Sequence, residues 1–260
     1  ALLRYAFSAC LRLPDAIVVL TVEEESQYRA TAGDTRVLRI PNAVDLTPYA
    51  DFKPREYGQG TIRLAYIGRL AADKGIYETV EALAILVRRG TAGSLRLDIA
   101  GTGPEEPQLR ERVAEYGIGG HVRFLGAVFG EGKQRFWREA DLFVFPSTHH
   151  EGLPYAVLES LAAGTPLVTT RVGGIPDAVS EGIHGVFLDY VSPVSVADAI
   201  SALVADRARL RAMSTSCRRR AAEQYGIARL EHQFAELYAE IFINARGSRG
   251  PRGYRRSAPG

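Results

Sequence analysis

The sequence predicts an α/β protein built on a doubly wound parallel sheet. From residue 62 onward, short apolar runs alternate with longer segments of helical period, and no internal repeat is present. Strands separated by helices imply right-handed crossovers, which place helices on both faces of the sheet. The 46% hydrophobic content of the 260 residues is that of a globular protein with a sizeable core. Ligands of such a sheet bind at the carboxyl ends of its strands.

Residues 1–54 are expected to form a separate N-terminal piece with its linker. Thr21 and Glu24 have the spacing of a capping box at a helix start. Residues 41–60 are rich in Pro and Gly and have neither a helical nor a strand period. The expected order is a helix at the start of the chain, a strand at 16–20, the capped helix, a strand at 37–40 and the linker at 41–60.

Residues 55–225 are expected to form the sheet domain. Each apolar run in this part is short enough for a buried parallel strand, and the segments between the runs are long enough for crossover helices. Strands are expected at 62–67, 95–100, 122–125, 141–145, 167–169 and 186–188, and helices at 75–89, 105–116, 133–138, 154–163, 194–205 and 207–224.

The chain is expected to finish with a helix, assigned to 226–243, and a disordered basic tail at 244–260. Leu230, Phe234 and Leu237 fall on one face of the helix, so its apolar stripe must pack against another element. The tail has five arginines among Gly, Ser and Pro, and no acidic residue.

Charge and cysteine content exclude several classes of protein. The net charge of +2 includes the five tail arginines, so the rest of the chain is acidic and is not a nucleic-acid binder by charge. Cys10 and Cys217 are solitary, which argues against disulfides and zinc and favours a reducing compartment. No apolar run approaches the ~18 residues of a membrane span. We therefore expect a cytoplasmic protein, with the basic tail available for peripheral contact with the cytoplasmic face of a membrane.

Glu151 and Glu159 lie on either side of a helix start predicted at Pro154. Free amides and the positive dipole end of a helix favour a bound anion. Because helical side chains tilt toward the N-terminus, Glu159 can reach the pocket that Glu151 lines from the loop. Carboxylates beside an anion can accept hydrogen bonds from hydroxyl groups, so a nucleotide sugar suits the pocket. The alternative is that Glu151 caps the helix and Glu159 is solvated.

Arg69 and Lys74 follow the first strand of the sheet domain and suit a diphosphate, Arg through its planar fork and Lys as a point charge. The alternative is a pair of surface charges. Cations are disfavoured at a helix start, so Lys74 favours a bound anion. Hydrolysis by the two glutamates is a further alternative, but it leaves both cations without a role.

Two further sequence patterns are weaker evidence for a cofactor or metal site. Gly101 and Gly103 resemble part of a dinucleotide fingerprint, but Glu106 stands where the third glycine would fall. We expect structural glycines that let this turn pass close to a neighbouring loop. His149 and His150 are adjacent and so do not converge easily on a metal, although one of them can hydrogen-bond a sugar hydroxyl.

Together these blocks resemble the retaining glycosyltransferases of family 4, whose GT-B fold places the active site between two Rossmann-like domains. The resemblance covers about residues 15–243 and makes the sheet domain the nucleotide-sugar-binding C-terminal domain. The matching blocks lie at 40–45, 68–75, 99–104, 122–126, 141–147, 151–159, 162–166 and 172–177.

The resemblance implies a role for each site residue. Arg69 and Lys74 would bind the donor diphosphate and Glu151 would contact the donor sugar, which makes these three the implied catalytic residues, while Glu159 would accept from the ribose hydroxyls. The family retains the anomeric configuration, and protein groups mainly stabilise the departing diphosphate. No metal or other cofactor is implied. The implied donor-binding set also includes Gly68, Val128, Lys133, Gly152, Leu153, Pro154 and Tyr155, with Val128 and Lys133 near the base.

The chain departs from the family pattern in the linker, at the helix start near Glu151 and in its N-terminal part. Ala43 replaces a glycine usual in the linker block, and Pro154 replaces the glycine of many relatives and removes one amide from the helix start. Residues 1–54 match only the end of the N-terminal acceptor domain. We therefore expect a fragment or a truncated gene product that does not transfer sugar by itself.

The expected function is transfer of a sugar, with retention, from a nucleotide-diphosphate-sugar to a glycan or glycolipid acceptor in cell-envelope or exopolysaccharide synthesis. The expected partners are the donor, the acceptor and the missing N-terminal domain. The alternatives are a non-catalytic nucleotide-binding module, a subunit of a split enzyme, and another GT-B activity such as a nucleotide-sugar epimerase or a phosphorylase.

Overall fold

The centre of the molecule is a six-stranded sheet in the order β5-β4-β3-β6-β7-β8, with every neighbouring pair parallel. The computed structural model describes residues 7, 9–58, 60–91 and 95–247. The first strand of the domain lies in the middle, which confirms the predicted α/β class and parallel sheet. The strands are β3 Ile62–Ile67, β4 Leu95–Ala100, β5 Val122–Gly126, β6 Leu142–Phe145, β7 Leu167–Thr169 and β8 Gly185–Phe187.

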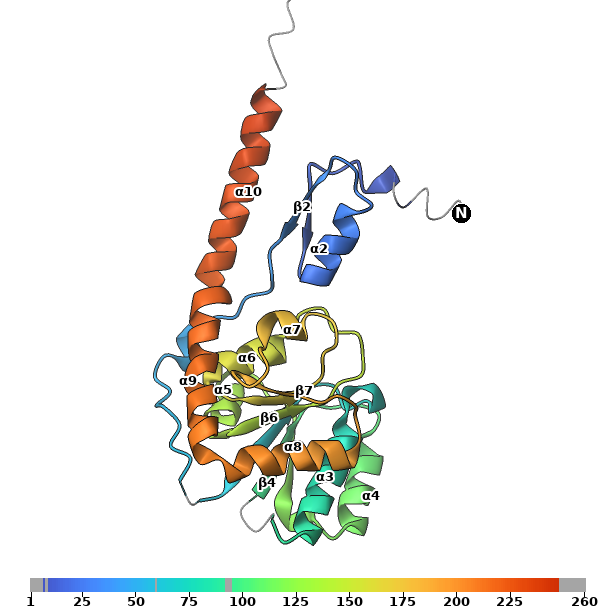
Figure 1. Ribbon diagram of the computed structural model, residues 1–260, viewed down its shortest axis with the longest axis vertical. Helices are drawn as coiled ribbons and strands as arrows, with labels where there is room; N and C mark the ends of the chain where they lie inside the picture. Colours follow the sequence, from blue (N-terminus) through green and yellow to red (C-terminus); the bar gives the residue numbers. More distant parts are fainter. Residues whose placement is uncertain (1–6, 8, 59, 92–94, 248–260) are drawn as a thin grey trace, which may run out of the picture.

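Helices cover both faces of this sheet (Figure 1). α3 packs against α4 and α8, while α6 packs against α5 and α9. Right-handed crossovers on the two sides of the reversal between β3 and β6 place these groups on opposite faces. The helices are α3 Ile76–Arg88, α4 Glu106–Glu115, α5 Gly130–Glu139, α6 Tyr155–Ala163, α7 Ile175–Ala178, α8 Pro193–Ala205, α9 Arg207–Gln224 and α10 Ile227–Gly247.

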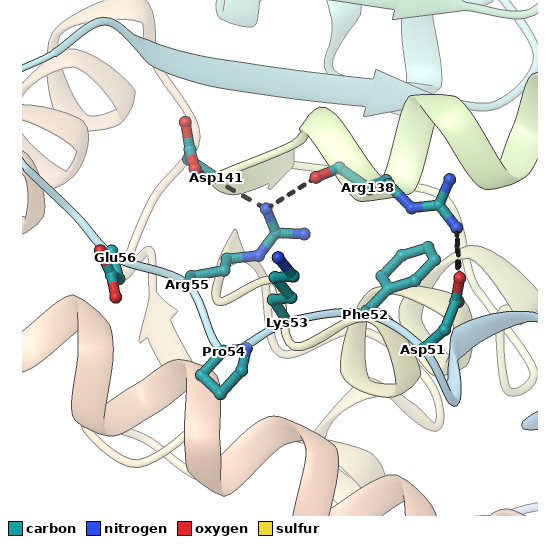
Figure 2. Close-up of a pocket in the computed structure, with 8 residues that line it drawn as sticks. All are labelled: Asp51, Phe52, Lys53, Pro54, Arg55, Glu56, Arg138 and Asp141. Carbon is teal, nitrogen blue, oxygen red and sulfur yellow. Dashed lines mark hydrogen bonds and ion pairs between the residues drawn. The ribbon is translucent and has the colours of Figure 1, made fainter.

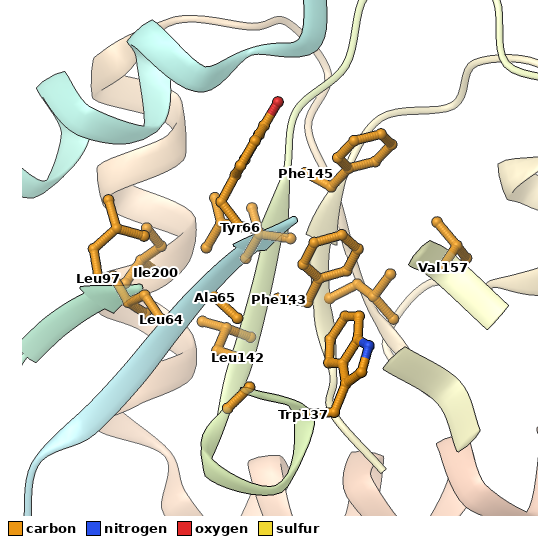
Figure 3. Packing of buried hydrophobic residues seen from close by; sticks show 14 of the residues in the cluster. Leu64, Ala65, Tyr66, Leu97, Trp137, Leu142, Phe143, Phe145, Val157 and Ile200 are labelled. Carbon is orange, nitrogen blue, oxygen red and sulfur yellow. The ribbon is translucent and has the colours of Figure 1, made fainter. Parts of the chain in front are cut away.

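The core lies between the central strands and these helices (Figure 3). Leu64, Tyr66 and Phe143 are fully buried, as expected for parallel strands that are covered on both faces. Trp137 of α5 packs edge-on against Phe143, with ring centroids 5.3 Å apart. Aromatic packing of this kind fixes α5 against the middle of the sheet.

Several helix boundaries differ from those expected, and three of the differences have a local physical reason. α5 begins at Gly130 rather than at 133, because its first turn contains two glycines whose low helix propensity hides the start in the sequence. Pro154 is the N-cap of α6 and not its first helical residue, since its ψ of 130° is extended. α10 continues to Gly247, past the expected end at 243, because no Gly or Pro interrupts it earlier.

The N-terminal part forms a small unit of its own (Figure 1). β1 Ala16–Val19 and β2 Arg36–Arg39 pair in parallel, and α2 Val22–Arg29 connects them. The predicted capping box of Thr21 and Glu24 is present. Buried Val19, Ala32 and Val37 form a core separate from that of the main sheet. Residues 1–6 and 8 of the expected first helix, and 248–260 of the expected tail, lie outside the described residues.

The linker follows β2 and contains a 3₁₀ turn at Thr47–Tyr49. It is anchored to the main domain by arginines: Arg218 of α9 donates to the carbonyl of Phe52, and the Arg55 guanidinium donates to the carbonyl of Trp137 at 2.6 Å. Within the described residues, no helix combines the length and the apolar content needed to cross a bilayer.

Candidate functional site

The loops after β3 and β6 meet where the strand order of the sheet reverses. β3 and β6 are hydrogen-bonded neighbours, so their carboxyl ends form the crevice in which open α/β sheets bind ligands. The amides of Thr148 and His149, after β6, donate to the carbonyl of Asp73, after β3, at 3.0 and 3.1 Å. These bonds hold the two loops together.

Lys74 and Glu151 meet at this crevice. Lys74 Nζ donates to Glu151 Oε1 at 2.6 Å, and Ser147 Oγ donates to the same oxygen at 2.9 Å. The two charged side chains are 14% and 13% exposed, so the pair is mostly buried. α6 has no side-chain cap, which excludes the alternative that Glu151 caps this helix. Both donors use Oε1, and no hydrogen bond to Oε2 is found among the residues that the structure describes.

Glu159 of α6 receives donors from α5 at both of its oxygens. Lys133 Nζ donates to Oε1 at 2.6 Å, and Trp137 Nε1 donates to Oε2 at 3.1 Å. The Glu159 side chain is 12% exposed and is therefore not the solvated residue of the alternative reading. It lines a cavity of about 270 Å³ together with Ala43, Val44, Asp45, Pro48, Tyr49, Gly130, Lys133, Gln134 and Tyr155.

The linker forms one wall of this cavity, which the sequence did not indicate. Burial raises the pKa of the Tyr49 phenol, and the nearby carboxylates of Glu159 and Asp45 raise it further. Tyr49 is therefore neutral at ordinary pH and keeps its hydroxyl proton beside the cavity. A neutral phenol adds a polar group without adding charge.

Arg69 lies at the same strand end as Lys74 but is more exposed. Its side chain is 61% exposed, and its guanidinium lies 3.7 Å from Asp73 Oδ1. The Arg69 carbonyl accepts from the Tyr66 hydroxyl at 3.1 Å. Burial raises the pKa of Tyr66, with further contributions from Glu151 and Asp73. Glu151 and Asp73 are therefore both close enough to Tyr66 to raise the pKa of its phenol.

Glycines let the loops at this edge approach one another. A Cβ at Gly101 would overlap the carbonyl oxygen of Gly68, and one at Gly103 would overlap the carbonyl oxygen of Leu70. The expectation that Gly101 and Gly103 are structural is confirmed. Gly68, which belongs to the expected donor-binding set, is part of this contact between the loops after β3 and β4.

The loop after β7 fixes the backbone of the acid loop, residues 146–153, which carries Glu151. Gly173 has a φ of +52°, and a Cβ there would overlap the carbonyl oxygen of Glu151. The amide of Gly174 donates to the carbonyls of Glu151 and Gly152 at 3.1 and 2.7 Å. Any side chain at Gly173 would push the acid loop away from the crevice.

At the start of α6, a buried side chain and an exposed side chain lie on either side of Pro154. Leu153 is 3% exposed, and its carbonyl accepts from Asn42 of the linker at 2.9 Å. Tyr155 is 57% exposed. Because Pro154 has no N–H group, the free amides of this helix start begin at Tyr155.

The remaining expected residues lie around this centre. Val128 lies in the loop between β5 and α5, and its side chain packs against the main core. His149 Nδ1 lies 2.9 Å from Asp73 Oδ2, so this histidine is held by the loop after β3. Among the described residues, no group of three or more His, Cys, Asp or Glu side chains is arranged to hold a metal ion.

Besides the linker residues, the expected set lacked three residues whose side chains contact its members: Asp73, Trp137 and Ser147. Trp137 lies four residues after Lys133, the spacing that puts both on one face of a helix, so a signal for it existed. Asp73 and Ser147 act through contacts between loops, for which the sequence has no periodic signal. The crevice and the cavity beside Glu159 together offer carboxylate oxygens, ammonium groups and helix amides, a set that suits a ligand bearing both hydroxyls and negative charge.

Comparison with known proteins gives the family. Residues 61–206 match the family model described as glycosyl transferases group 1. The chain is 30% identical over 222 residues to a glycogen synthase of Mycobacterium tuberculosis, covering 84% of this chain and 51% of that protein. It is 31% identical over 261 residues to a D-inositol 3-phosphate glycosyltransferase of Nocardia farcinica, covering 94% and 57%. The chain thus spans about half the length of the curated relatives it matches.

Solved structures share the fold. Sucrose-phosphate synthase from Thermosynechococcus elongatus superposes with a TM-score of 0.78 at 24% identity, over 93% of this chain and 62% of that one. Anabaena HepE in complex with UDP gives a TM-score of 0.79 at 19% identity, over 92% and 67%. These neighbours are GT-B glycosyltransferases. Because the family model matches more than half of the residues and the relatives reach 30% identity, this chain belongs to the glycosyl transferases group 1 family.

Proposed function

We propose that this chain is the donor-binding half of a glycosyltransferase that uses a nucleotide-diphosphate-sugar. The observation that carries the proposal is a pair of carboxylates, each bound by one lysine at 2.6 Å: Glu151 by Lys74 at the switch point of the sheet, and Glu159 by Lys133 in the cavity between α5, α6 and the linker. A nucleotide sugar has a diphosphate between two hydroxyl-bearing sugars. Two acceptor carboxylates with cations beside them complement that order of groups.

Each group in the crevice then has a role. Lys74 has two further N–H donors for phosphate oxygens, and Arg69 supplies a second cation at the same strand end. The amides at the start of α6 face negative charge favourably. Glu151 Oε2 accepts from a donor-sugar hydroxyl, and Glu159 accepts from the ribose.

The proposed reaction transfers the sugar with retention. The bond between the anomeric carbon and the phosphate oxygen breaks, the acceptor oxygen bonds to the same face of that carbon, and the leaving phosphate oxygen takes the acceptor proton. Negative charge accumulates on the diphosphate as it leaves. Lys74, Arg69 and the helix amides stabilise that charge in a partly dry site.

One solved neighbour and two relatives support the donor and acceptor classes. Anabaena HepE structures contain UDP, UDP with glucose, or UDP-glucose. The relatives named glycogen synthase and D-inositol 3-phosphate glycosyltransferase act on different acceptors. We therefore propose a nucleotide sugar as donor and, more broadly, a glycan or glycolipid of the cell envelope as acceptor. The proposed location is the cytoplasm, with the basic tail contacting the anionic membrane face.

Calorimetry with UDP, ADP, GDP and TDP tests the donor site. We expect at least one of the four to bind to the folded chain, because all the proposed phosphate-binding groups lie in one domain. A folded chain with no affinity for any of them would overturn the proposal.

Proton NMR tests the stereochemistry. Slow hydrolysis of the matching α-linked sugar nucleotide, with water as acceptor, should release the α-anomer first. Initial release of the β-anomer would contradict retention.

A further inference from the structure

Trp137 is the only tryptophan of the chain, and its side chain contacts the candidate site directly. It is fully buried, and its Nε1 donates to Glu159 Oε2 at 3.1 Å. Lys133, four residues earlier on α5, binds Glu159 Oε1 at 2.6 Å. One face of α5 therefore holds both oxygens of a carboxylate that belongs to α6.

The indole has little freedom to release this carboxylate. Trp137 packs edge-on against Phe136, at a centroid distance of 5.1 Å, and against Phe143, at 5.3 Å. Figure 3 shows Trp137 beside Phe143. A buried N–H group without an acceptor is costly, so the indole keeps its bond to Glu159. The aromatic cluster thus fixes the plane of the carboxylate.

Arg55 of the linker holds the C-terminal ends of the same two helices. Its guanidinium donates to the carbonyl of Trp137 at 2.6 Å and to the carbonyl of Arg138 at 3.3 Å, both at the end of α5. Figure 2 shows the contact with Arg138. The Arg55 guanidinium also donates to the carbonyl of Gly164, just after α6, at 3.2 Å. α5 and α6 are therefore tied together at one end by Arg55 and nearer the crevice by the contacts to Glu159.

We propose that Trp137 is a positioning residue that orients Glu159 for the two hydroxyls of a ribose. The inference rests on the proposed function, in which Glu159 accepts from the ribose. A carboxylate has about four acceptor sites, and Lys133 and Trp137 use two of them. The other two can accept the adjacent 2′ and 3′ hydroxyls only if the carboxylate plane is fixed. Without the indole N–H, the carboxylate turns and discrimination for these hydroxyls is lost.

The test compares nucleotides with and without the two hydroxyls. The probe is the tightest binder among UDP, ADP and GDP, measured by calorimetry beside its 2′,3′-dideoxy analogue. In the wild-type chain the ribose form should bind on the order of 10-fold more tightly or better, because charge-assisted bonds are lost in the analogue. In Trp137→Phe this ratio should fall by about 5-fold or more, with the analogue's own affinity unchanged.

Phe143→Leu is the matched control. Phe143 belongs to the same buried aromatic cluster but has no polar atom to bond Glu159. This variant should lose stability and keep the wild-type ratio, because a purely structural defect weakens both nucleotides alike. An unchanged ratio in Trp137→Phe would overturn the inference and leave the donor site standing.

A measurement on the wild-type chain covers the case in which Trp137→Phe does not fold. In a ¹⁵N-labelled sample, the single tryptophan gives one indole N–H signal in the NMR spectrum. This signal should shift when the ribose nucleotide binds but not when the dideoxy analogue binds. Equal shifts for both would overturn the inference. A wild-type chain that binds neither nucleotide, or binds both equally, would overturn the assignment of Glu159 to the ribose and the inference with it.

Discussion

Lys74 shows how one side chain can be both anchored and available to a ligand. Its side chain is 14% exposed, and its ammonium donates one hydrogen bond to Glu151. A lysine just before α3 is unfavourable beside the positive dipole end, and the hydrogen bond to Glu151 offsets that cost. A bound diphosphate would add negative charge on the other side of the ammonium.

Replacement of Lys74 by Ala should weaken binding of a nucleoside diphosphate by ~1.5 to 3 kcal/mol, the scale of a charge-assisted hydrogen bond. Arg69→Ala should weaken it in the same direction, and by less, because Arg69 is 61% exposed. Arg89→Ala is the control, since Arg89 pairs with Asp198 at 2.6 Å and belongs to no proposed subsite. Calorimetry in which Lys74→Ala binds like Arg89→Ala would remove the phosphate assignment.

His184 should make stability depend on pH. Burial lowers its pKa to about 4, and nearby Arg220 and Arg219 act in the same direction. The unfolded chain takes up this proton near pH 6.5, and the folded chain does so only near pH 4. The contribution of the neutral ring is therefore complete above pH 6.5 and is lost as the pH falls to 4.

The variant His184→Asn isolates this effect. Asn keeps an acceptor for the Ser180 amide, which now donates to His184 Nδ1 at 2.9 Å, and does not titrate. Between pH 7 and pH 4, urea denaturation should show the wild type losing ~1 to 3 kcal/mol more than the variant. Parallel pH profiles would contradict the assigned protonation.

At the scale of elements, the glycine turn after β7, with Gly173 and Gly174, holds the backbone of the acid loop after β6. The carbonyls of Glu151 and Gly152 both accept from the amide of Gly174. Such close contact between two loops requires that the turn have no side chain at Gly173.

Gly173→Ala should therefore displace the acid loop as well as strain the turn. We expect a loss of at least ~2 kcal/mol in stability and a clear loss of nucleotide affinity, because φ is +52° and the new Cβ overlaps a backbone carbonyl. Gly117→Ala is matched in strain, with a φ of +66° and no atom within 4 Å of the added Cβ. That control should lose only ~1 to 2 kcal/mol and bind nucleotide normally. If both variants bind equally well, the turn does not position Glu151.

At the scale of the whole molecule, two cores of very different size are present. Within the described residues, the main core reaches from Val44 to Tyr225, whereas the other consists of buried Val19, Ala32 and Val37 with partly buried Leu11, Ile17 and Tyr28 packed against them. A two-stranded sheet with so small a core is marginal in isolation. Its contact with the main domain includes the Val22 amide, which donates to Asp177 at 2.7 Å.

Hydrogen exchange should separate these two parts. Amides of β1 and β2 should exchange at least ~100-fold faster than those of β3 and β4, because local opening of the small unit exposes little apolar surface. Asp177→Ala should speed exchange in α2 further and leave β3 unchanged. Equal protection throughout would mean that the chain opens as one cooperative unit.

The local patterns of the sequence were sufficient for the class and the order of elements. Apolar runs and helical periods depend on neighbours within a few residues, so the strands of the sheet and the capping box of Thr21 and Glu24 could be predicted. Gly101 and Gly103 could also be assigned a structural role, since a turn that approaches another backbone needs residues without side chains.

Which side chains meet was decided by the tertiary structure. Glu159 is held by Trp137, 22 positions away, and Lys74 reaches Glu151 across 77. Such pairs depend on which strands become neighbours and on the face where each crossover helix packs, and no local period carries that information. The sequence by itself determined the kinds of charge at the carboxyl edge of the sheet. The tertiary structure decided which groups these charged side chains contact. It also placed the linker beside Glu159 and the turn after β7 against the backbone of Glu151, because the order of the strands brings distant loops together.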